Sequence, residues 1–566
     1  MRRRRIVAFV AALGLLATAC AGGGGDSNEG GQTTGGGSAT ANDINPVERD
    51  ALPDGGTLRW SITGMPANYN SGELDGTNID TSSVMGALLP AMFDFDAKAE
   101  PTVNRDYLES AEVTGTDPKQ VVTYKINPKA AWDDGTPITW ADFEAQWKAR
   151  NGTNPAYRIS SSNGYEHIES VVRGVDDREA IVTYKQRFVD WKGLFSYLYP
   201  ASTNNDPAIF NDGWKEKPLA TAGPFRLESI DLTGQSITLV RNDKWWGERA
   251  KLDRIVYRVI AADAEIDALV NNEIDFMDIG PDVNKFQRAS QASGVTIRKA
   301  GGPNFRHITI NGASEVLKDV KVRKALALAI NREQIAKILL GPLGVETTPL
   351  QNHIFMANQT GYKDNAGELS THNVEEAKRL LDEAGWKVQG DIRKKDGKDL
   401  VIRFVIPSAV ASSLQESNLV MAMLKEVNAR VDIVTVPAAD FFDKHITPGN
   451  YDLTVFSWLG TALPISSAKS IYAQPTPRPD GTLELRQNYA RTGSPEIDAL
   501  FDQASTEIDQ QKAIDLANQA DALIWQLVHS LTLYQRPELI AVRGGLANFG
   551  AFGFASTRYE DIGFAK

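Results

Sequence analysis

The sequence predicts a protein of mixed α/β lobes, because strand and helix signals alternate along most of its length. Residues 58–62 alternate between apolar and polar side chains, which is the period of a half-buried strand. Further along, Thr139 and Asp142 have the spacing of a capping box and predict a helix over residues 140–150. Since strands and helices occur in mixed order, the fold class is α/β or α+β.

Other segments repeat these two patterns. Strand-like runs recur at residues 122–126, 181–185, 236–240, 255–260, 401–406, 431–436 and 453–458. Apolar residues with the helical spacing predict a helix over 322–330. Asn373 and Gly385 are typical start and end residues for a second helix, over 374–384. The sequence contains no internal repeat.

Length and composition limit the class of protein. The 566 residues are enough for roughly three folding units. A formal net charge of −12 argues against nucleic acid as a partner, because binding it requires a basic surface. With one cysteine and six scattered histidines, we expect no intramolecular disulfide, no cysteine- or histidine-rich metal site and no cofactor.

The N-terminal segment has the pattern of an export and anchoring signal. Arg2–Arg5 precede an apolar run at residues 6–16, which is too short to cross a bilayer but suits a signal peptide. Small residues then lead to Cys20, as in the bacterial lipobox, although alanine occupies the position where the lipobox prefers leucine. We expect a signal peptide over residues 1–19 and lipidation of Cys20. A flexible Gly/Ser-rich tether over 20–50 would then attach the rest of the chain to the extracytoplasmic face of a cell membrane. The alternative is an ordinary signal peptide with a chance cysteine.

Known catalytic motifs are missing from the sequence. It contains no GxxxxGK[ST], no GxSxG and no strand-anchored GxGxxG. The acidic pairs at 133–134 and 176–177 are sequence neighbours, which rarely face one cleft as glycosidase carboxylates do. The sequence therefore gives no positive support for an enzyme, and we expect none. A secreted hydrolase would need a carboxylate cluster or a nucleophile that these motifs do not supply.

Several segments follow one another in the order of a known family. They lie at residues 123–142 with a DGTP turn, 221–227, 241–255, 271–275, 311–332, 377–386, 451–458 and 533–537. Together they span about residues 55–540, and the chain resembles the bacterial dipeptide/oligopeptide-binding family of extracellular solute-binding proteins. The resemblance implies a two-lobed fold of the periplasmic-binding-protein type II, peptide-binding class, with an extra subdomain.

The family layout divides the chain into two lobes. It assigns residues 51–80, 218–300 and 531–566 to lobe I, residues 81–217 to its extra subdomain, and residues 301–530 to lobe II. The resemblance implies that the ligand lies between the lobes and that the loaded protein docks on an ABC-type import permease. The expected partners are a peptide or other small molecule, the permease and ATPase subunits, and the membrane through the lipid anchor. We expect a monomer.

Ligand-binding residues are also inferred from family position. The predicted set is Ser61, Thr63, Gly64, Met65, Trp458, Thr461, Tyr534 and Asn311. Trp458 matches the tryptophan of the family's glycine–tryptophan loop, although Ser457 precedes it here. Peptide binders of the family often carry an aspartate about three residues after this tryptophan, to pair with the α-amine of the ligand. Thr461 occupies that position, and residues 458–464 contain no acid.

Two functions therefore remain open. The first is the lipid-anchored binding subunit of a dipeptide or oligopeptide importer. The second is an envelope lipoprotein of the same fold that binds a glycolipid or another non-peptide and has a regulatory role. The missing acid after Trp458 favours the second, and the identity of the bound ligand would distinguish them.

Overall fold

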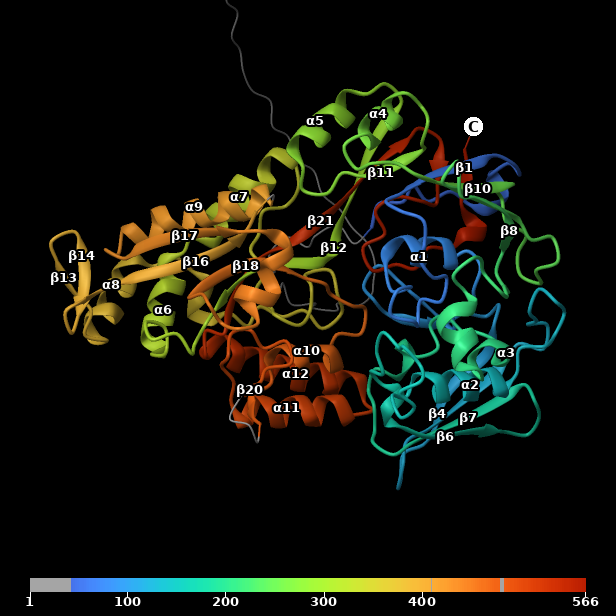
Figure 1. The fold of residues 1–566 in the computed structure, drawn as a ribbon, viewed down its shortest axis with the longest axis horizontal. Helices are drawn as coiled ribbons and strands as arrows, with labels where there is room; N and C mark the ends of the chain where they lie inside the picture. Colours follow the sequence, from blue (N-terminus) through green and yellow to red (C-terminus); the bar gives the residue numbers. More distant parts are fainter. Residues whose placement is uncertain (1–41, 409, 479–482, 566) are drawn as a thin grey trace, which may run out of the picture. The chain divides into compact units, whose positions relative to one another are not determined.

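The computed structural model describes residues 42–408, 410–478 and 483–565, which fold into mixed α/β lobes as predicted (Figure 1). The predicted signal peptide, Cys20 and the first part of the predicted tether lie outside the described residues. Several elements predicted from the sequence are present in the structure. Helix α2 (Trp140–Arg150) has the predicted bounds, and its capping box is formed, with the Thr139 amide donating to the Asp142 carboxylate over 2.8 Å.

Two four-stranded sheets, built from strands between residues 57 and 259, form one part of the protein. The first sheet has the order β1 (Thr57–Ile62), β10 (Arg254–Val259), β9 (Ser236–Arg241) and β8 (Phe225–Asp231). The second sheet has the order β4 (Leu108–Gly115), β5 (Val121–Ile126), β7 (Glu179–Tyr184) and β6 (Ile168–Arg173). Strand β1 runs parallel to β10, whereas the other neighbours in these sheets are antiparallel. Helices α1 (Ile79–Met85) and α3 (Ala201–Asn204) and the hairpin of β2 (Phe93–Phe95) and β3 (Pro101–Val103) complete this part.

A third, six-stranded sheet forms the other lobe. Its order is β11 (Phe276–Asp278), β21 (Ser530–Arg543), β12 (Val295–Ile310), β18 (Leu453–Trp458), β16 (Val401–Pro407) and β17 (Arg430–Val436). The helices of this lobe are α4 (Glu265–Val270), α5 (Val283–Gln291), α6 (Val320–Ala329), α7 (Arg332–Leu340), α8 (Val374–Glu383) and α9 (Ala411–Lys425). A further group comprises α10 (Ile465–Tyr472), α11 (Pro495–Thr506) and α12 (Gln510–Gln526). The short strands are β13 (Lys387–Gln389), β14 (Ile392–Lys395), β15 (Lys398–Asp399), β19 (Thr476–Pro477), β20 (Leu483–Glu484), β22 (Leu546–Ala547) and β23 (Gly563–Phe564).

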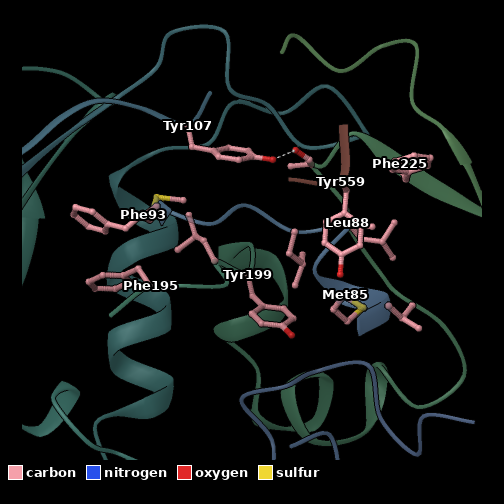
Figure 2. Close-up of a cluster of buried hydrophobic side chains, with 14 of the residues drawn as sticks. Met85, Leu88, Phe93, Tyr107, Phe195, Tyr199, Phe225 and Tyr559 are labelled. Atoms are coloured by element: carbon pink, nitrogen blue, oxygen red, sulfur yellow. Dashed lines mark hydrogen bonds between the residues drawn. The ribbon is translucent and has the colours of Figure 1, made fainter. Parts of the chain in front are cut away.

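Two hydrophobic cores lie beneath these sheets. The first core collects the buried side chains of the first two sheets. Figure 2 shows part of it, including Phe93, Phe195, Tyr199, Phe225 and Tyr559. Within this part the Tyr107 hydroxyl donates to the Ala222 carbonyl over 3.0 Å, so that a buried phenol keeps a hydrogen-bond partner. The second core collects the buried side chains of the third sheet and of α4–α9.

Strands β12 and β21 form an antiparallel pair, here called the central ribbon, that borders both cores. Because side chains alternate along a strand, its two faces enter different cores. Leu539 and Ala541 belong to the second core, whereas Ile540 and Val542 between and beyond them belong to the first. The ribbon therefore serves as a shared wall, and its pairing holds the two cores in one structure.

The structure differs from the predicted boundaries in two places. Residues 43–50 were assigned to the tether, but the Asp43 amide donates to the Ala551 carbonyl over 2.8 Å and Asn548 bonds the Val47 backbone in both directions. Residues 218–300 were assigned to lobe I, but α4, β11 and α5 contribute Leu269, Met277 and Ala289 to the second core. In both cases long-range packing, which local sequence patterns do not report, decides where the segment belongs.

A buried ion pair fastens the central ribbon to helix α9. Arg306 donates through Nε to Glu416 Oε1 over 3.1 Å and through a second nitrogen to the other carboxylate oxygen. The Tyr534 hydroxyl donates to the same Oε1 over 2.7 Å. Both charged side chains are almost fully buried, so removing either one leaves an uncompensated charge in the core.

We predict that Glu416→Ala lowers the free energy of unfolding by about 3–5 kcal/mol, because Arg306 stays buried without its carboxylate. The matched control is Glu375→Ala, which removes an exposed helical glutamate paired with Lys378 and should cost less than about 1 kcal/mol. Urea unfolding followed by tryptophan fluorescence measures both. Equal losses in the two variants would contradict this account of the pair.

Candidate functional site

Both strands of the ribbon become partly exposed near its centre. The pairing is regular up to Gly301 opposite Pro537 and then shifts register before Phe305 opposite Gln535. Residues 303–304 and 535–538 are partly exposed in this stretch, whereas most of the ribbon's other residues from 298 to 310 are buried. At Gly302 a Cβ atom would lie 2.8 Å from the Arg536 carbonyl oxygen, so the close approach of the two strands requires glycine there.

The predicted residues 61–65 follow the end of β1. The Ser61 hydroxyl donates to Glu265 over 2.9 Å, and the Asp80 carboxylate accepts the amides of Thr63 and Gly64 at 3.1 Å each. The family position predicts ligand contacts in this segment, and these two amides are already bonded within the protein. A Cβ atom at Gly64 would meet no atom within 4 Å, so the space beside it is open. Met65 is partly buried against the first core.

Two acidic side chains outside the predicted set have raised pKa values: Glu265, which Ser61 contacts, and Glu538 on β21. Burial raises the pKa of Glu265, and the charges of Asp278 and Asp80 raise it further. Burial likewise raises the pKa of Glu538 on β21 to about 7, with the Asp278 charge adding to the effect and a hydrogen bond from the Gly553 amide opposing it. Glu538 directly follows a family segment, at residues 533–537, which is the sequence signal that could have identified it.

Trp458 ends β18, where it pairs with Phe305 of the central ribbon, and its side chain lies within a group of aromatic rings. Its ring stacks on Tyr489 with a centroid distance of 5.9 Å and an interplanar angle of 2°, and on His307 at 5.7 Å and 11°. Phe456 meets it edge-on at 5.2 Å. Trp458 is only partly buried, and the next residue, Leu459, is 77% exposed. The stack thus fixes the indole while leaving part of it free for a ligand.

The loop after Trp458 lies against the centre of the ribbon. A Cβ atom at Gly460 would stand 2.1 Å from the Pro303 carbonyl oxygen, so only glycine permits this approach. Thr461 is exposed; its hydroxyl donates to the Leu463 carbonyl over 3.1 Å, and its carbonyl accepts from the Gln359 amide at 3.0 Å. The structure therefore places Trp458 and Thr461 beside the partly exposed centre of the ribbon.

Tyr534 and Asn311 do not join this group. Tyr534 is 2% exposed and its hydroxyl is bonded to Glu416. The Asn311 amide donates to the Tyr451 and Gly449 carbonyls over 2.8 and 3.1 Å. Since Ile310, next to Asn311, pairs with the start of β18 and Trp458 ends that strand, roughly 17 Å separates the two positions. The polar groups of both side chains are therefore hydrogen-bonded within the second lobe.

Metal-binding clusters and membrane-spanning helices are both absent from the described residues. Within residues 42–408, 410–478 and 483–565, no group of three or more histidine, cysteine, aspartate or glutamate side chains is arranged to hold a metal ion. Across the same ranges, no helix has the length and apolar character needed to cross a membrane.

Comparison with known proteins decides the family. Residues 105–477 match the model of the bacterial extracellular solute-binding proteins, family 5 middle region. The chain is 41% identical over 531 residues to the oligopeptide-binding protein OppA of Mycobacterium tuberculosis (strain ATCC 25618 / H37Rv), covering 93% of this chain and 88% of that protein. This chain is a family 5 extracellular solute-binding protein. Family 5 members are binding proteins of transport systems and not enzymes, which agrees with the absence of catalytic motifs.

Two further proteins are similar to this chain. The solved structure of the periplasmic EDTA-binding protein EppA matches with a TM-score of 0.82 and 27% identity, covering 94% of this chain and all of that one. The two-lobed solute-binding fold predicted from the sequence is thereby confirmed. A second relative from Mycobacterium tuberculosis, the probable monoacyl phosphatidylinositol tetramannoside-binding protein LpqW, is 30% identical over 283 residues, half of this chain and 44% of that protein.

Glu538 predicts how stability depends on pH. Its pKa in the folded protein, about 7, lies above the ordinary value of 4.5, so the folded state holds the proton more tightly than the unfolded state. Stability from this group is therefore full below about pH 4.5 and falls as the pH rises through 7. We expect Glu538→Gln, which keeps the shape without the charge, to raise the melting temperature at pH 8 and to leave it nearly unchanged at pH 5.

Thermal melts of both proteins across pH 5–8 measure this difference. The control is Glu484→Gln, an exposed glutamate on β20, which should shift neither end of the range. A Glu538→Gln protein that melts below the parent at pH 8 would refute the assigned direction.

Proposed function

We propose that this protein captures oligopeptides or dipeptides between its two lobes and delivers them to an ABC-type import permease. The observation that carries the proposal is the 41% identity to a protein named as oligopeptide-binding, over nearly the full length of this chain. The geometry supports it, because Trp458 pairs with Phe305 at the partly exposed centre of the ribbon and Thr461 follows in the loop that lies on Pro303. The assigned contacts are Ser61, Thr63, Gly64, Met65, Trp458 and Thr461; Tyr534 and Asn311 are assigned to the frame of the second lobe.

Recognition in this site would rest on shape and backbone contacts more than on one fixed charge. The Trp458 loop supplies no carboxylate for a ligand amine. A peptide held extended makes main-chain hydrogen bonds that do not depend on its sequence, and water around its side chains tolerates their variety. The partly free indole of Trp458 would add apolar contact with a ligand side chain.

A second candidate ligand is a non-peptide, such as a glycolipid or another small molecule, with a regulatory role for the protein. Two observations favour it. The acid expected after Trp458 is missing, and two relatives are named for binding a mannosylated phosphatidylinositol and EDTA. The same site would then recognise a molecule that lacks a free α-amine.

Ligand identification separates these candidates. The chain from Ala21 onward, expressed in the cytoplasm, purified gently and denatured, should release a ladder of short peptides detectable by mass spectrometry. A lipid, a glycan or a single metabolite in their place would favour the second candidate and refute the first.

The same preparation tests the assigned site. Trp458→Ala should weaken binding of the released ligand by about thirtyfold, as expected for the loss of a central aromatic contact. Trp246→Ala is the matched control, since that partly exposed tryptophan packs on Tyr107 in the first core and donates to the Asp106 carbonyl. Similar losses of affinity in both variants would remove Trp458 from the site.

We also propose that Cys20 carries the lipid anchor. The cysteine is the single one in the chain and follows an apolar segment and small residues. Cys20→Ser in the native host should move the protein from the membrane fraction to the soluble fraction and abolish incorporation of a labelled fatty acid. A Cys20→Ser protein that still incorporates the label would refute the anchor.

A further inference from the structure

A loop of the predicted subdomain, residues 188–193, reaches into the second lobe. The Val189 amide donates to the Ser505 carbonyl, at the end of α11, over 2.8 Å. The Val189 side chain is 7% exposed and belongs to a cluster otherwise built from the loop after residue 350 and helices α10–α12. One residue of this loop is therefore part of the hydrophobic core of the other lobe.

The next residue, Asp190, caps a helix of that lobe. Its carboxylate accepts the Ser466 amide, in the first turn of α10, over 2.8 Å, and Asp190 is 5% exposed. Helix α10 has no side-chain cap of its own, because Pro464 precedes it. An aspartate at a helix N-terminus satisfies an amide that has no partner within the helix and complements the helix dipole. Here the cap comes from the loop of the predicted subdomain and not from the lobe that contains α10.

A second loop, residues 96–100, makes a parallel contact. The Thr360 amide donates to the Lys98 carbonyl over 3.1 Å, and Ala99 is buried in a cluster with Phe305 and Met356. Asp96 accepts the amides of residues 98 and 100 at 2.8 Å each and so fixes this turn. Both loops also line one small pocket with residues 463–465, Phe355 and Gln510.

The first loop is fixed rigidly to its own subdomain. Gln120, fully buried at the start of β5, donates to the Phe188 carbonyl over 3.3 Å and accepts the Phe188 amide at 2.8 Å. The Phe188 ring packs so closely on Gly164 that a Cβ atom there would lie 2.7 Å from it. The loop therefore moves with the subdomain and not as a flexible strap.

We propose that residues 96–100 and 188–193 form a clasp that holds the two lobes together and must disengage before a ligand can enter or leave. The clasp is adjacent in the chain to the proposed ligand site. The loop that begins at Trp458 reaches Leu463, which lies beside Gly193, and then enters the first turn of α10, which Asp190 caps. It acts between protein groups alone, so it holds whether the ligand is a peptide or another molecule.

Single-molecule FRET on the full chain tests the clasp without any ligand. With Cys20→Ser in place, Lys125→Cys on β5 and Lys425→Cys on α9 give two exposed dye positions, since Cys20 is the only cysteine of the chain. The parent should populate a closed distance. Asp190→Ala should raise the ratio of open to closed molecules about fivefold, the effect of losing one helix cap, and Val189→Asp should raise it further.

The matched control is Asp509→Ala, which removes the cap of α12 within one lobe and should leave the ratio unchanged. Thermal melts establish that each variant is folded, and Val189→Ala replaces Val189→Asp if the latter does not fold. Unchanged ratios in Asp190→Ala and the folded Val189 variant would overturn the proposal, as would a parent that shows open distances alone. Because no ligand is added, this outcome is independent of the proposed transport function.

Discussion

The pairing of β12 with β21 is the interaction on which the rest of the structure depends. The two strands run from Val295 opposite Arg543 to Thr309 opposite Ser530, and their alternating side chains enter two separate cores. A shift of one residue in this register would turn the side chains of the ribbon to the opposite core. The register shifts between Gly301 and Phe305, where residues 303–304 are partly exposed, and again between the buried Arg306 and His307. The candidate ligand site thus lies beside the partly exposed centre of the ribbon.

Elements whose signals are local were predictable from the sequence, whereas the ribbon was not. Helices α2 and α8 follow from their caps, because Thr139 and Asn373 bond amides a few residues away. Strands such as β18 follow from short apolar runs. The ribbon carries Gly301, Gly302 and Pro303 on one strand and Pro537 on the other, which locally indicate a turn or a strand end. Long-range pairing overrides that local preference, and no periodicity could reveal it.

The candidate site was predictable in part for the same reason. Family order located Trp458 and the segment after β1, since both end strands of the common fold. It could not show that Asp80 already binds the amides of Thr63 and Gly64, or that Tyr534 belongs to the Arg306–Glu416 pair. Residues in motifs that a family shares can have structural roles, as Tyr534 does here. The raised pKa values of Glu265 and Glu538 come from tertiary burial, which no local sequence pattern reports; the position of Glu538 directly after a family segment is the one signal the sequence offers for either acid.

The loop from Trp458 to α10 connects ligand contact with the state of the lobes. At its start, Trp458 is held by stacked rings and Gly460 lies on the ribbon; in its middle, Gln359 binds the carbonyls of Thr461 and Ala462. At its end the first turn of α10 receives its cap from Asp190. The loop is therefore held at both ends and in its middle by contacts within the protein. The proposed ligand contact and the proposed clasp therefore share one short segment, and the two proposals together predict that ligand binding and lobe contact are coupled.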